Sequence, residues 1–566
     1  MFGISVIDLL VIAFYAFIVI WLGWKAKKKV SSSGDYFMGG RRGSKIMQIA
    51  NALGAGTHTA QAIAVSGATY QIGLAGIWYQ WLYLFSTPIY WLLAPIYRRL
   101  RYITIGDFFQ ERYGLKLASA YSVMGLIYFI GEVGLILKAT GVSLEAITGG
   151  AVSAEVIVVV LTIFFLSYSV IGGLTSALII NLLQGVLIVM LSFLIIPFAL
   201  YAGGGISAIK AKIPEHMFSF VAPEEVTLFF IIMLIVNGLV GVSVLPHHMA
   251  INGSGKSEMN CRTGWTYGNF TKRFATLGWA FVGVFAAALF PGLASDKREF
   301  AFGIAITNLL PVGLIGVMIS AMIATVLAAC HNYMVGGSAL FTRNFYKRFT
   351  HHDSTEKEKL KVARISSLVV VIGGVTVALT IPTVVDGLKY IWQITAFFGI
   401  AFWVGVMWRR ANRYGVWASL ITTITLSLYT GKYTPWSLGL PFEYQIAIYL
   451  PAGFISLIVV SLLTKPEPES QLNKFFALLH TPVGEENKLK EKGYEIMLEG
   501  ESVAHKSAVE GTSLEENGHS LLLVDLLSLK SKFSLKRYKV DLFGFGLAIL
   551  FVIAILLFGI FVSSIG

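Results

Sequence analysis

Six titratable side chains fall within apolar stretches of the sequence, and their types suit the binding of a proton or a charged solute. They are His58, Glu132, Lys138, His247, His248 and His331. An ionised group in an apolar environment is costly, so each of them needs a partner or a function. Histidine titrates nearest to physiological pH, and a buried carboxylate can also exchange protons there. Because no two of these histidines have the i,i+4 spacing of a helical metal site, we expect no bound metal.

The composition indicates that these groups belong to a membrane protein. Of the 566 residues, 56% are hydrophobic and 13% are charged, and the mean hydropathy is +0.72. A soluble domain of this length needs more charge to cover its surface. Apolar runs such as 4–24 and 540–562 reach the roughly 20 residues that a helix needs to cross the hydrocarbon core. The alternation typical of a membrane β-barrel is missing, so the sequence predicts an all-α polytopic membrane protein.

The basic residues behind the net charge of +13 cluster in alternate loops between the apolar runs. The clusters are Lys25 to Lys29 with Arg41, Arg42 and Lys45; Arg98, Arg99 and Arg101; Lys256, Arg262, Lys272 and Arg273; Arg343, Lys347 and Arg348; and Arg409, Arg410 and Arg413. The positive-inside rule puts these loops in the cytoplasm of a plasma (inner) membrane and the N-terminus outside. The lipid bilayer therefore explains the charge, and we expect no nucleic-acid partner.

The sequence predicts about fourteen transmembrane helices. We place them at 4–24, 45–71, 76–97, 118–147, 153–171, 176–201, 224–249, 274–292, 312–342, 364–383, 388–408, 414–431, 446–464 and 541–563. The composition turns polar and charged at 465–540, which indicates a cytoplasmic linker before a C-terminal helix in 541–566. Within this linker, 521–540 mixes Leu with Lys and Arg, so it is either an amphipathic segment on the membrane surface or a tether.

Two of the predicted helices contain residues that interrupt a helix. The second has Gly54, Gly56 and His58 near its middle, and the seventh has Gly238 followed by Pro246. The two helices are five apart and cross the membrane in opposite directions, as in inverted repeats that each begin with a broken helix. The expected organisation is an N-terminal helix and loop at 1–44, repeats at 45–201 and 202–410, two helices at 411–464, the linker at 465–540 and the last helix at 541–566.

Five short motifs occur in order, each beside the expected helix: DYFMGGR at 35–41, SGATYQIG at 66–73, GDFFQERYG at 106–114, YSVIGGL at 168–174 and FTRNFYK at 341–347. Together they resemble the sodium/solute symporter family, whose members carry sugars, proline, sialic acid and iodide. The resemblance implies a LeuT-type fold, with helices 2–6 and 7–11 as its two inverted repeats. It also implies a carrier, and we find no nucleophile–base arrangement or complete phosphate-binding loop, so we expect neither an enzyme nor a cofactor.

The resemblance fails at the sodium site. Sodium-coupled members hold the ion with carbonyls of the broken helix 2 and with two adjacent Ser or Thr hydroxyls on helix 9. Here those hydroxyl positions are Ala328 and Ala329, whereas a hard cation needs several oxygen ligands. The other positions of this degenerate site are Gly54, Thr57, Thr325 and Asn181, the last replacing an Asp found in many members. We therefore expect a carrier that does not use sodium in the familiar way.

A proton could replace the ion, with Glu132 or His331 as its carrier. Alternatively, the ammonium of Lys138 could stand where sodium would bind, which would make the protein an uncoupled facilitator. By position, the resemblance implies a substrate site formed by His58, Gln61, Tyr79, Gln80, Glu132, Ser243 and His247. Ser243 lies where a sugar-carrying member has part of an aromatic pair, which disfavours a sugar.

The sequence thus predicts a secondary transporter of a small polar or charged organic solute that works by alternating access. It is expected to be proton-coupled or uncoupled. Two alternatives remain open: a sodium/solute symporter with a relocated ion site, and a transporter-like solute sensor that acts through a protein partner.

Overall fold

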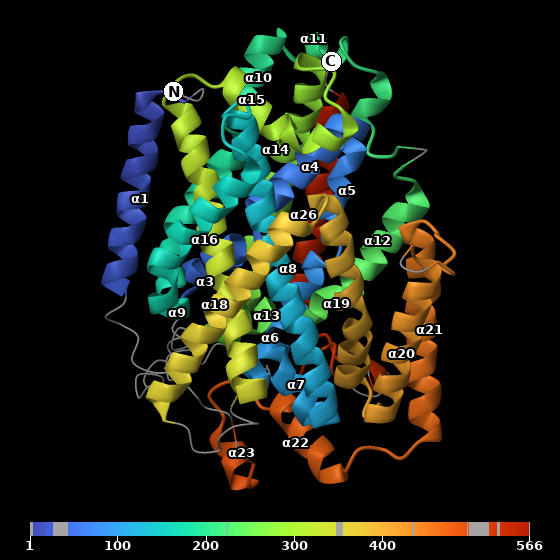
Figure 1. The fold of residues 1–566 in the computed structure, drawn as a ribbon. Coiled ribbons are helices and arrows are strands. Elements are labelled where there is room, and N and C mark those ends of the chain that lie inside the picture. The colour runs from blue at the N-terminus through green and yellow to red at the C-terminus, as the bar shows by residue number, and fades with distance from the viewer. Residues whose placement is uncertain are drawn as a thin grey trace.

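The computed structural model describes residues 4–26, 43–222, 225–346, 355–432, 435–494, 496, 520–528 and 533–564, without the side chains of 22–26, 55, 167–183, 356, 357 and 359. Over these residues the chain is almost entirely helical (Figure 1). Both termini lie at the same end of the bundle, and the helices α7 (Ile105–Tyr113), α22 (Glu469–His480) and α23 (Asn487–Glu491) lie at the opposite end, here named the linker end.

Eight helices in the described part of the chain are long and apolar enough to cross a membrane. They are α8 (Leu115–Ile147), the segment Gln184–Gly203, α14 (Glu258–Leu289), α16 (Leu314–Phe341) with its π-helical extension, α18 (Glu356–Thr380), α19 (Val384–Met407), α21 (Phe442–Leu463) and α26 (Lys539–Ser564). The bent pair α12–α13 makes a ninth. The all-helical membrane fold is confirmed, whereas the count of fourteen is not.

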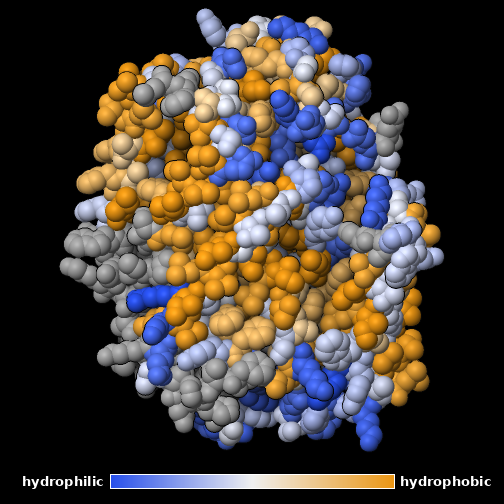
Figure 2. Space-filling model, viewed as in Figure 1, coloured by the Kyte–Doolittle hydropathy of each residue, from blue (hydrophilic) through white to orange (hydrophobic). Residues whose placement is uncertain are grey.

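Other helices are α1 (Val6–Ala26), α5 (Trp78–Trp81), α6 (Thr87–Leu100), α9 (Ala154–Phe193), α10 (Ile195–Gly203), α15 (Ala301–Leu309) and α20 (Arg413–Thr430). The segment Gln184–Gly203 named above comprises the end of α9 together with α10. Hydrophobic residues cover the middle of the visible face, and hydrophilic residues gather at its lower edge and around its upper right (Figure 2). The predicted boundary between helices 5 and 6, at 171–176, falls on α9 where side chains are not described.

Both predicted helix breaks are present. The first separates α3 (Lys45–Gly56) from α4 (Thr59–Ile72), because Thr57 and His58 are extended, with ψ of 118° and 165°. The second follows α12 (Leu228–Gly241) and the short 3-10 turn η5 (Val242–Val244), before α13 (His247–Gly253) continues at an angle of 60°. Pro246 lies at this second bend, where it removes one backbone donor and so ends the first segment.

One helix begins sixteen residues earlier than the sequence suggests, at Glu258 instead of 274. This helix, α14, packs against α3, α4 and α6, and two glycines on it allow close approach of the backbones. A side chain at Gly268 would collide with Ile49 and Ala52 of α3, and one at Gly283 would collide with Ser66 of α4. The assignment of Lys272 and Arg273 to a cytoplasmic loop is therefore wrong, because both lie within α14 and are buried.

The predicted linker is partly folded against the linker end. The Arg99 Nη1 atom donates to the carbonyl oxygen of Leu479 at 3.2 Å, and Arg101 forms an ion pair with Glu486 at 2.9 Å. Of the predicted amphipathic segment, the structure describes 521–528 and 533–540, where Leu521 and Tyr538 are buried against the protein. The last helix, α26, then packs along α6 and α14.

Candidate functional site

The break between α3 and α4 is stabilised by α16. The first amide groups of a helix have no partner within that helix. Here the Thr325 hydroxyl accepts a hydrogen bond from the Thr59 backbone N–H at 3.1 Å and donates to the Met322 carbonyl oxygen at 2.8 Å. The two threonine hydroxyls also hydrogen-bond to each other. Thr325 is thus an N-cap supplied by a neighbouring helix.

A cavity lies beside this break. It is lined by Gly56, Gln61, Gln80, Tyr83, Tyr90, Tyr128, Glu132, Leu245, His247, His248, Asn269, Lys272, Arg273, Tyr333, Leu388, Ile391 and Trp392. These residues come from both broken helices and from α5, α6, α8, α14, α16 and α19. The mixture of aromatic and polar side chains is of the kind that binds a small organic molecule.

One wall of the cavity is a chain of titratable and hydrogen-bonding groups. The Glu132 Oε2 atom on α8 lies 3.5 Å from the Nε2 atom of His58, which lies 3.2 Å from the Gln61 Nε2 atom. The Tyr128 hydroxyl lies 3.2 Å from the Nδ1 atom of His247 on α13. Through Glu132 and Tyr128, α8 thus contacts residues of both helix breaks.

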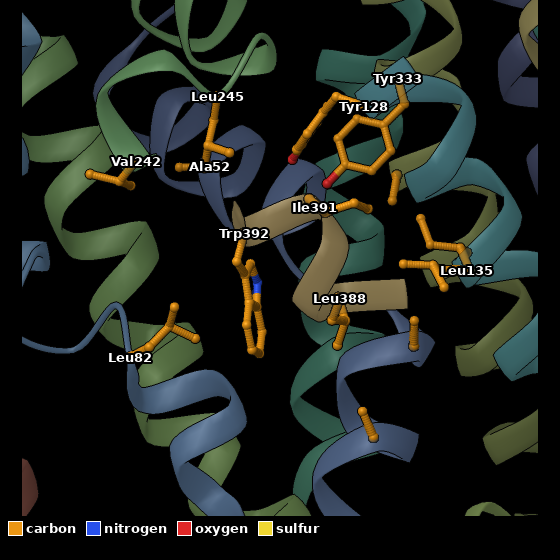
Figure 3. Close-up of a cluster of buried hydrophobic side chains, with 14 of the residues drawn as sticks. Ala52, Leu82, Tyr128, Leu135, Val242, Leu245, Tyr333, Leu388, Ile391 and Trp392 are labelled. Atoms are coloured by element: carbon orange, nitrogen blue, oxygen red, sulfur yellow. The ribbon is translucent and has the colours of Figure 1, made fainter. Parts of the chain in front are cut away.

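Apolar and aromatic side chains also line the site (Figure 3). Leu388, Ile391 and Trp392 project from a single helix, α19. The rings of Tyr128 and Tyr333 meet edge to face, with centroids 6.1 Å apart. A solute here would meet both apolar and hydrogen-bonding groups.

Two adjacent cations of α14 complete the lining. The Lys272 ammonium donates a hydrogen bond to the carbonyl oxygen of Gly56, the last residue of α3. The Arg273 Nε atom donates to the Thr87 hydroxyl at 3.3 Å, and its guanidinium lies 5.5 Å over the ring of Tyr83. Both cations are at least 95% buried. Lysine at the end of a half-helix complements the partial negative charge of the last carbonyl groups.

Of the predicted positions of the degenerate sodium site, Gly54 and Thr57 lie at the end of α3, and Thr325 contacts Thr59 just beyond the break. Ala328 and Ala329 on α16 are buried, and the Ala328 carbonyl oxygen already accepts a hydrogen bond from Asn332 at 2.8 Å. Gly54 and Thr57 are also buried, at the end of α3 and just beyond it. The side chain of Asn181 falls outside the described residues. The Thr325 oxygen is engaged in the cap of α4.

The cavity gathers four of the seven predicted substrate residues, namely Gln61, Gln80, Glu132 and His247. His58 does not line it but contacts Glu132 and Gln61 directly behind it. The other two, Tyr79 and Ser243, are not among the lining residues. Tyr79 lies beside Trp392, with ring centroids 6.5 Å apart, and the Ser243 hydroxyl donates to the Val240 carbonyl oxygen at 3.0 Å.

Two of the predicted coupling residues lie away from the cavity lining. Lys138 is half-buried on α8 and interacts electrostatically with Glu155 and Glu299. His331 is buried on α16. Among the described residues, no group of three or more His, Cys, Asp or Glu side chains has the geometry of a metal site.

Lys272 and Arg273 are site residues that the sequence does not predict. Clustered basic residues near apolar runs usually mark the cytoplasmic side, so both are expected in a loop. Trp265, Asn269 and Lys272 are spaced three to four residues apart, as on one helix face, but this spacing does not show what the two cations contact.

Known proteins similar to this chain include membrane transporters. The chain is 25% identical to a sodium/glucose cotransporter of Vibrio parahaemolyticus, over 82% of this chain and 91% of that protein. It is 26% identical to an osmoregulated proline transporter of Bacillus subtilis, over 84% of this chain and 98% of that protein. Among solved structures, a Na⁺-coupled sialic acid symporter matches with a TM-score of 0.70 and 18% identity, over 82% of this chain and 99% of that one.

The family expected from the sequence motifs is confirmed over most of the chain. Residues 36–423 match the model of the sodium:solute symporter family. The matched region contains both broken helices and every residue that lines the cavity. The chain therefore belongs to the sodium:solute symporter family, and it is a membrane transporter with a LeuT-type fold and not an enzyme.

Proposed function

We propose that this transporter carries a small polar or charged organic solute by alternating access, without a sodium ion at the site that the family resemblance indicates. One observation carries the proposal: the Lys272 ammonium is hydrogen-bonded to the Gly56 carbonyl at the helix break, where Ala328 and Ala329 supply no side-chain oxygen. We propose that the Lys272 amine is protonated, so that the break has a positive charge that belongs to the protein.

Physical chemistry favours this proposal in two ways. Sodium is a hard cation that requires several oxygen ligands, and two methyl groups provide none. A second cation near the buried ammonium would also be repelled, because charges interact strongly where water is excluded. The Thr325 hydroxyl adds little, since it is already bonded to Thr59 and Met322.

The coupling group we propose is Glu132, in contact with His58 at 3.5 Å. Neither Lys138 nor His331 lines the cavity, which makes these two residues weaker candidates. A carboxylate facing an imidazole can take up and release one proton between them. The transporter is then either proton-coupled through this pair or uncoupled, with its linker end in the cytoplasm and its N-terminus outside.

A second candidate is sodium coupling at a relocated site, because the names of several relatives state sodium dependence. The two candidates differ in the effect of sodium on the folded protein. We expect the thermal unfolding temperature of the purified full chain to be equal in sodium chloride and choline chloride at the same ionic strength. A sodium-specific increase that saturates would overturn the proposal, since an ion that binds the native state stabilises it by mass action.

A further inference from the structure

Arg273 is a buried guanidinium that faces the cavity with part of its hydrogen-bonding capacity unused. It is 1% exposed, and its Nε atom donates to the Thr87 hydroxyl at 3.3 Å. Its Nη1 atom has no hydrogen-bond partner among the described residues. The ring of Tyr83 covers one face of the guanidinium plane at 5.5 Å. Tyr90, which also lines the cavity, hydrogen-bonds to this guanidinium, so the N–H groups on Nη1 are the ones available to a molecule in the cavity.

Several other buried arginines of this protein have an acidic partner, whereas the buried Arg112 donates to the backbone carbonyl oxygens of Gly405, Trp408 and Arg409. Arg99 pairs with Glu258 at 2.9 Å, and Arg262 pairs with Asp541 at 2.6 Å. In the described part of the chain no ion pair includes Arg273. A buried cation without a counter-ion carries a large desolvation cost. A buried cation of this kind is most readily tolerated where a ligand supplies the missing anion.

The charges that line the cavity also favour an anion. Its basic side chains are Lys272 and Arg273, whereas its acidic side chain is Glu132, which contacts His58. With neutral histidines the lining is therefore net positive. An uncharged solute would leave the guanidinium without a counter-ion, and an organic cation would be repelled by the two basic groups.

We propose that the transported solute is a small organic carboxylate and that its carboxylate group binds Arg273. A guanidinium is planar and presents parallel N–H groups that match the two oxygens of a carboxylate. Trp392 and Ile391 lie in the same cavity and would contact the apolar body of the solute. This inference rests on the proposed transport function and specifies its substrate class.

The test uses the thermal unfolding temperature of the purified full chain, measured with matched pairs of probes. The choline salts of acetate, propionate, lactate and benzoate are compared with acetamide, propionamide, lactamide and benzamide. Inorganic sulfate and inorganic phosphate, each added as its choline salt, serve as the inorganic-anion controls. We expect at least one carboxylate to raise the unfolding temperature while its amide does not, because the amide has the same shape without the charge.

Three variants connect that response to Arg273. Arg273→Gln should lose it, and Arg273→Lys, which keeps the charge without the bidentate geometry, should bind about tenfold more weakly. Arg364→Gln, on the exposed side of α18, should respond as the wild type does. The unfolding transition of each variant without a probe reports whether it is folded, and Arg273→Lys remains informative if the glutamine variant does not fold.

Several results would overturn the inference. They are an equal response to amide and carboxylate, no response to any carboxylate, a response to sulfate or phosphate in place of the carboxylates, and an unchanged response in Arg273→Gln. A carboxylate response that requires sodium chloride would instead contradict the sodium-free mechanism and leave the carboxylate assignment intact. The two proposals can therefore fail separately.

Discussion

The Lys272 ammonium on α14 is hydrogen-bonded to the carbonyl oxygen of Gly56, at the C-terminal end of the half-helix α3. The last carbonyl groups of a helix lack partners within it and carry partial negative charge. In transporters built on broken helices, such carbonyl groups commonly coordinate the coupling ion. In the sodium-free mechanism proposed above, the Lys272 ammonium takes the place of that ion.

Replacing Lys272 by Met removes the ammonium and keeps most of the stem volume. We expect this variant to lose at least about tenfold in counterflow of the bound carboxylate, because the helix break loses its positive charge. We expect a small change in unfolding temperature, since removal of a buried charge can be neutral or even stabilising. Lys361→Met, at an exposed position of α18, is the control. Wild-type counterflow in Lys272→Met would contradict this role.

Thr325→Val tests the cap that α16 gives to α4. The substitution preserves shape but leaves the buried Thr59 N–H and the Thr59 hydroxyl without the Thr325 oxygen. Loss of such a cap typically costs about 1–2 kcal/mol, so the unfolding temperature should fall. Thr376→Val removes an exposed hydroxyl that bonds within its own helix, and it should change stability far less. Equal effects of the two variants would show that the cap is unimportant.

The helix breaks could be predicted from the sequence because their causes are local. Gly54, Gly56 and Pro246 disfavour a continuous helix whatever surrounds them. The cavity residues Gln61, Glu132 and His247 followed from polar side chains within apolar stretches and from the family resemblance. In each case one segment of sequence contained the necessary information.

Lys272 and Arg273 could not be found in this way, because their role depends on three helices that are distant in sequence. The partner of Lys272 is Gly56 on α3, and that of Arg273 is Thr87 on α6. From sequence alone the pair is indistinguishable from the basic residues of a cytoplasmic loop. The apolar wall supplied by Trp392 likewise depends on how α19 packs against the breaks.

The packing of the linker (465–540) against the rest of the protein should depend on pH, because Glu486 of the linker pairs with Arg101. Burial alone would raise the pKa of Glu486, but the Arg101 guanidinium and the Gly484 N–H outweigh it and hold this pKa below its ordinary value. A lowered carboxyl pKa stabilises the docked state fully above about pH 4.3, and this stabilisation is lost as the pH falls further. Hydrogen exchange of α22 and α23, corrected for intrinsic pH dependence, measures this loss.

The matched pair Glu486→Gln and Glu491→Gln separates this ion pair from general charge effects. Glu486→Gln removes the charge that pairs with Arg101 at 2.9 Å, so exchange in α23 should become about tenfold faster at neutral pH. Glu491 is exposed, and its replacement should leave the exchange rates unchanged. If exchange in Glu486→Gln matched the wild type, the ion pair would not hold the linker.

Glu132→Gln tests the proposed coupling pair. The amide keeps the size of the side chain and removes the proton-binding site that faces His58 at 3.5 Å. We expect the variant to fold at least as stably as the wild type, because a buried carboxylate is costly. The rate of counterflow, measured with the carboxylate that raises the unfolding temperature of the wild type, should fall about tenfold or more. A variant with both wild-type counterflow and wild-type pH dependence would exclude Glu132 from coupling.

A triple variant tests whether sodium binding can be restored at the degenerate sodium site. Ala328→Ser and Ala329→Ser restore two hydroxyl oxygens, and Lys272→Met removes the resident positive charge. Because sodium needs both oxygen ligands and an uncompensated negative environment, the triple variant should acquire sodium-dependent stabilisation that neither change gives alone. The comparison is made in sodium chloride and choline chloride at equal ionic strength.

The most direct measurement is equilibrium binding of radioactive sodium to the purified wild-type protein, with excess unlabelled sodium as competitor and choline to hold the ionic strength constant. We predict no saturable binding, because Lys272 already provides the cation at the Gly56 carbonyl and Ala328 and Ala329 provide no ligands. Saturable binding of one or more sodium ions per chain would contradict this prediction and would show that the protein is a sodium symporter with its ion at another site.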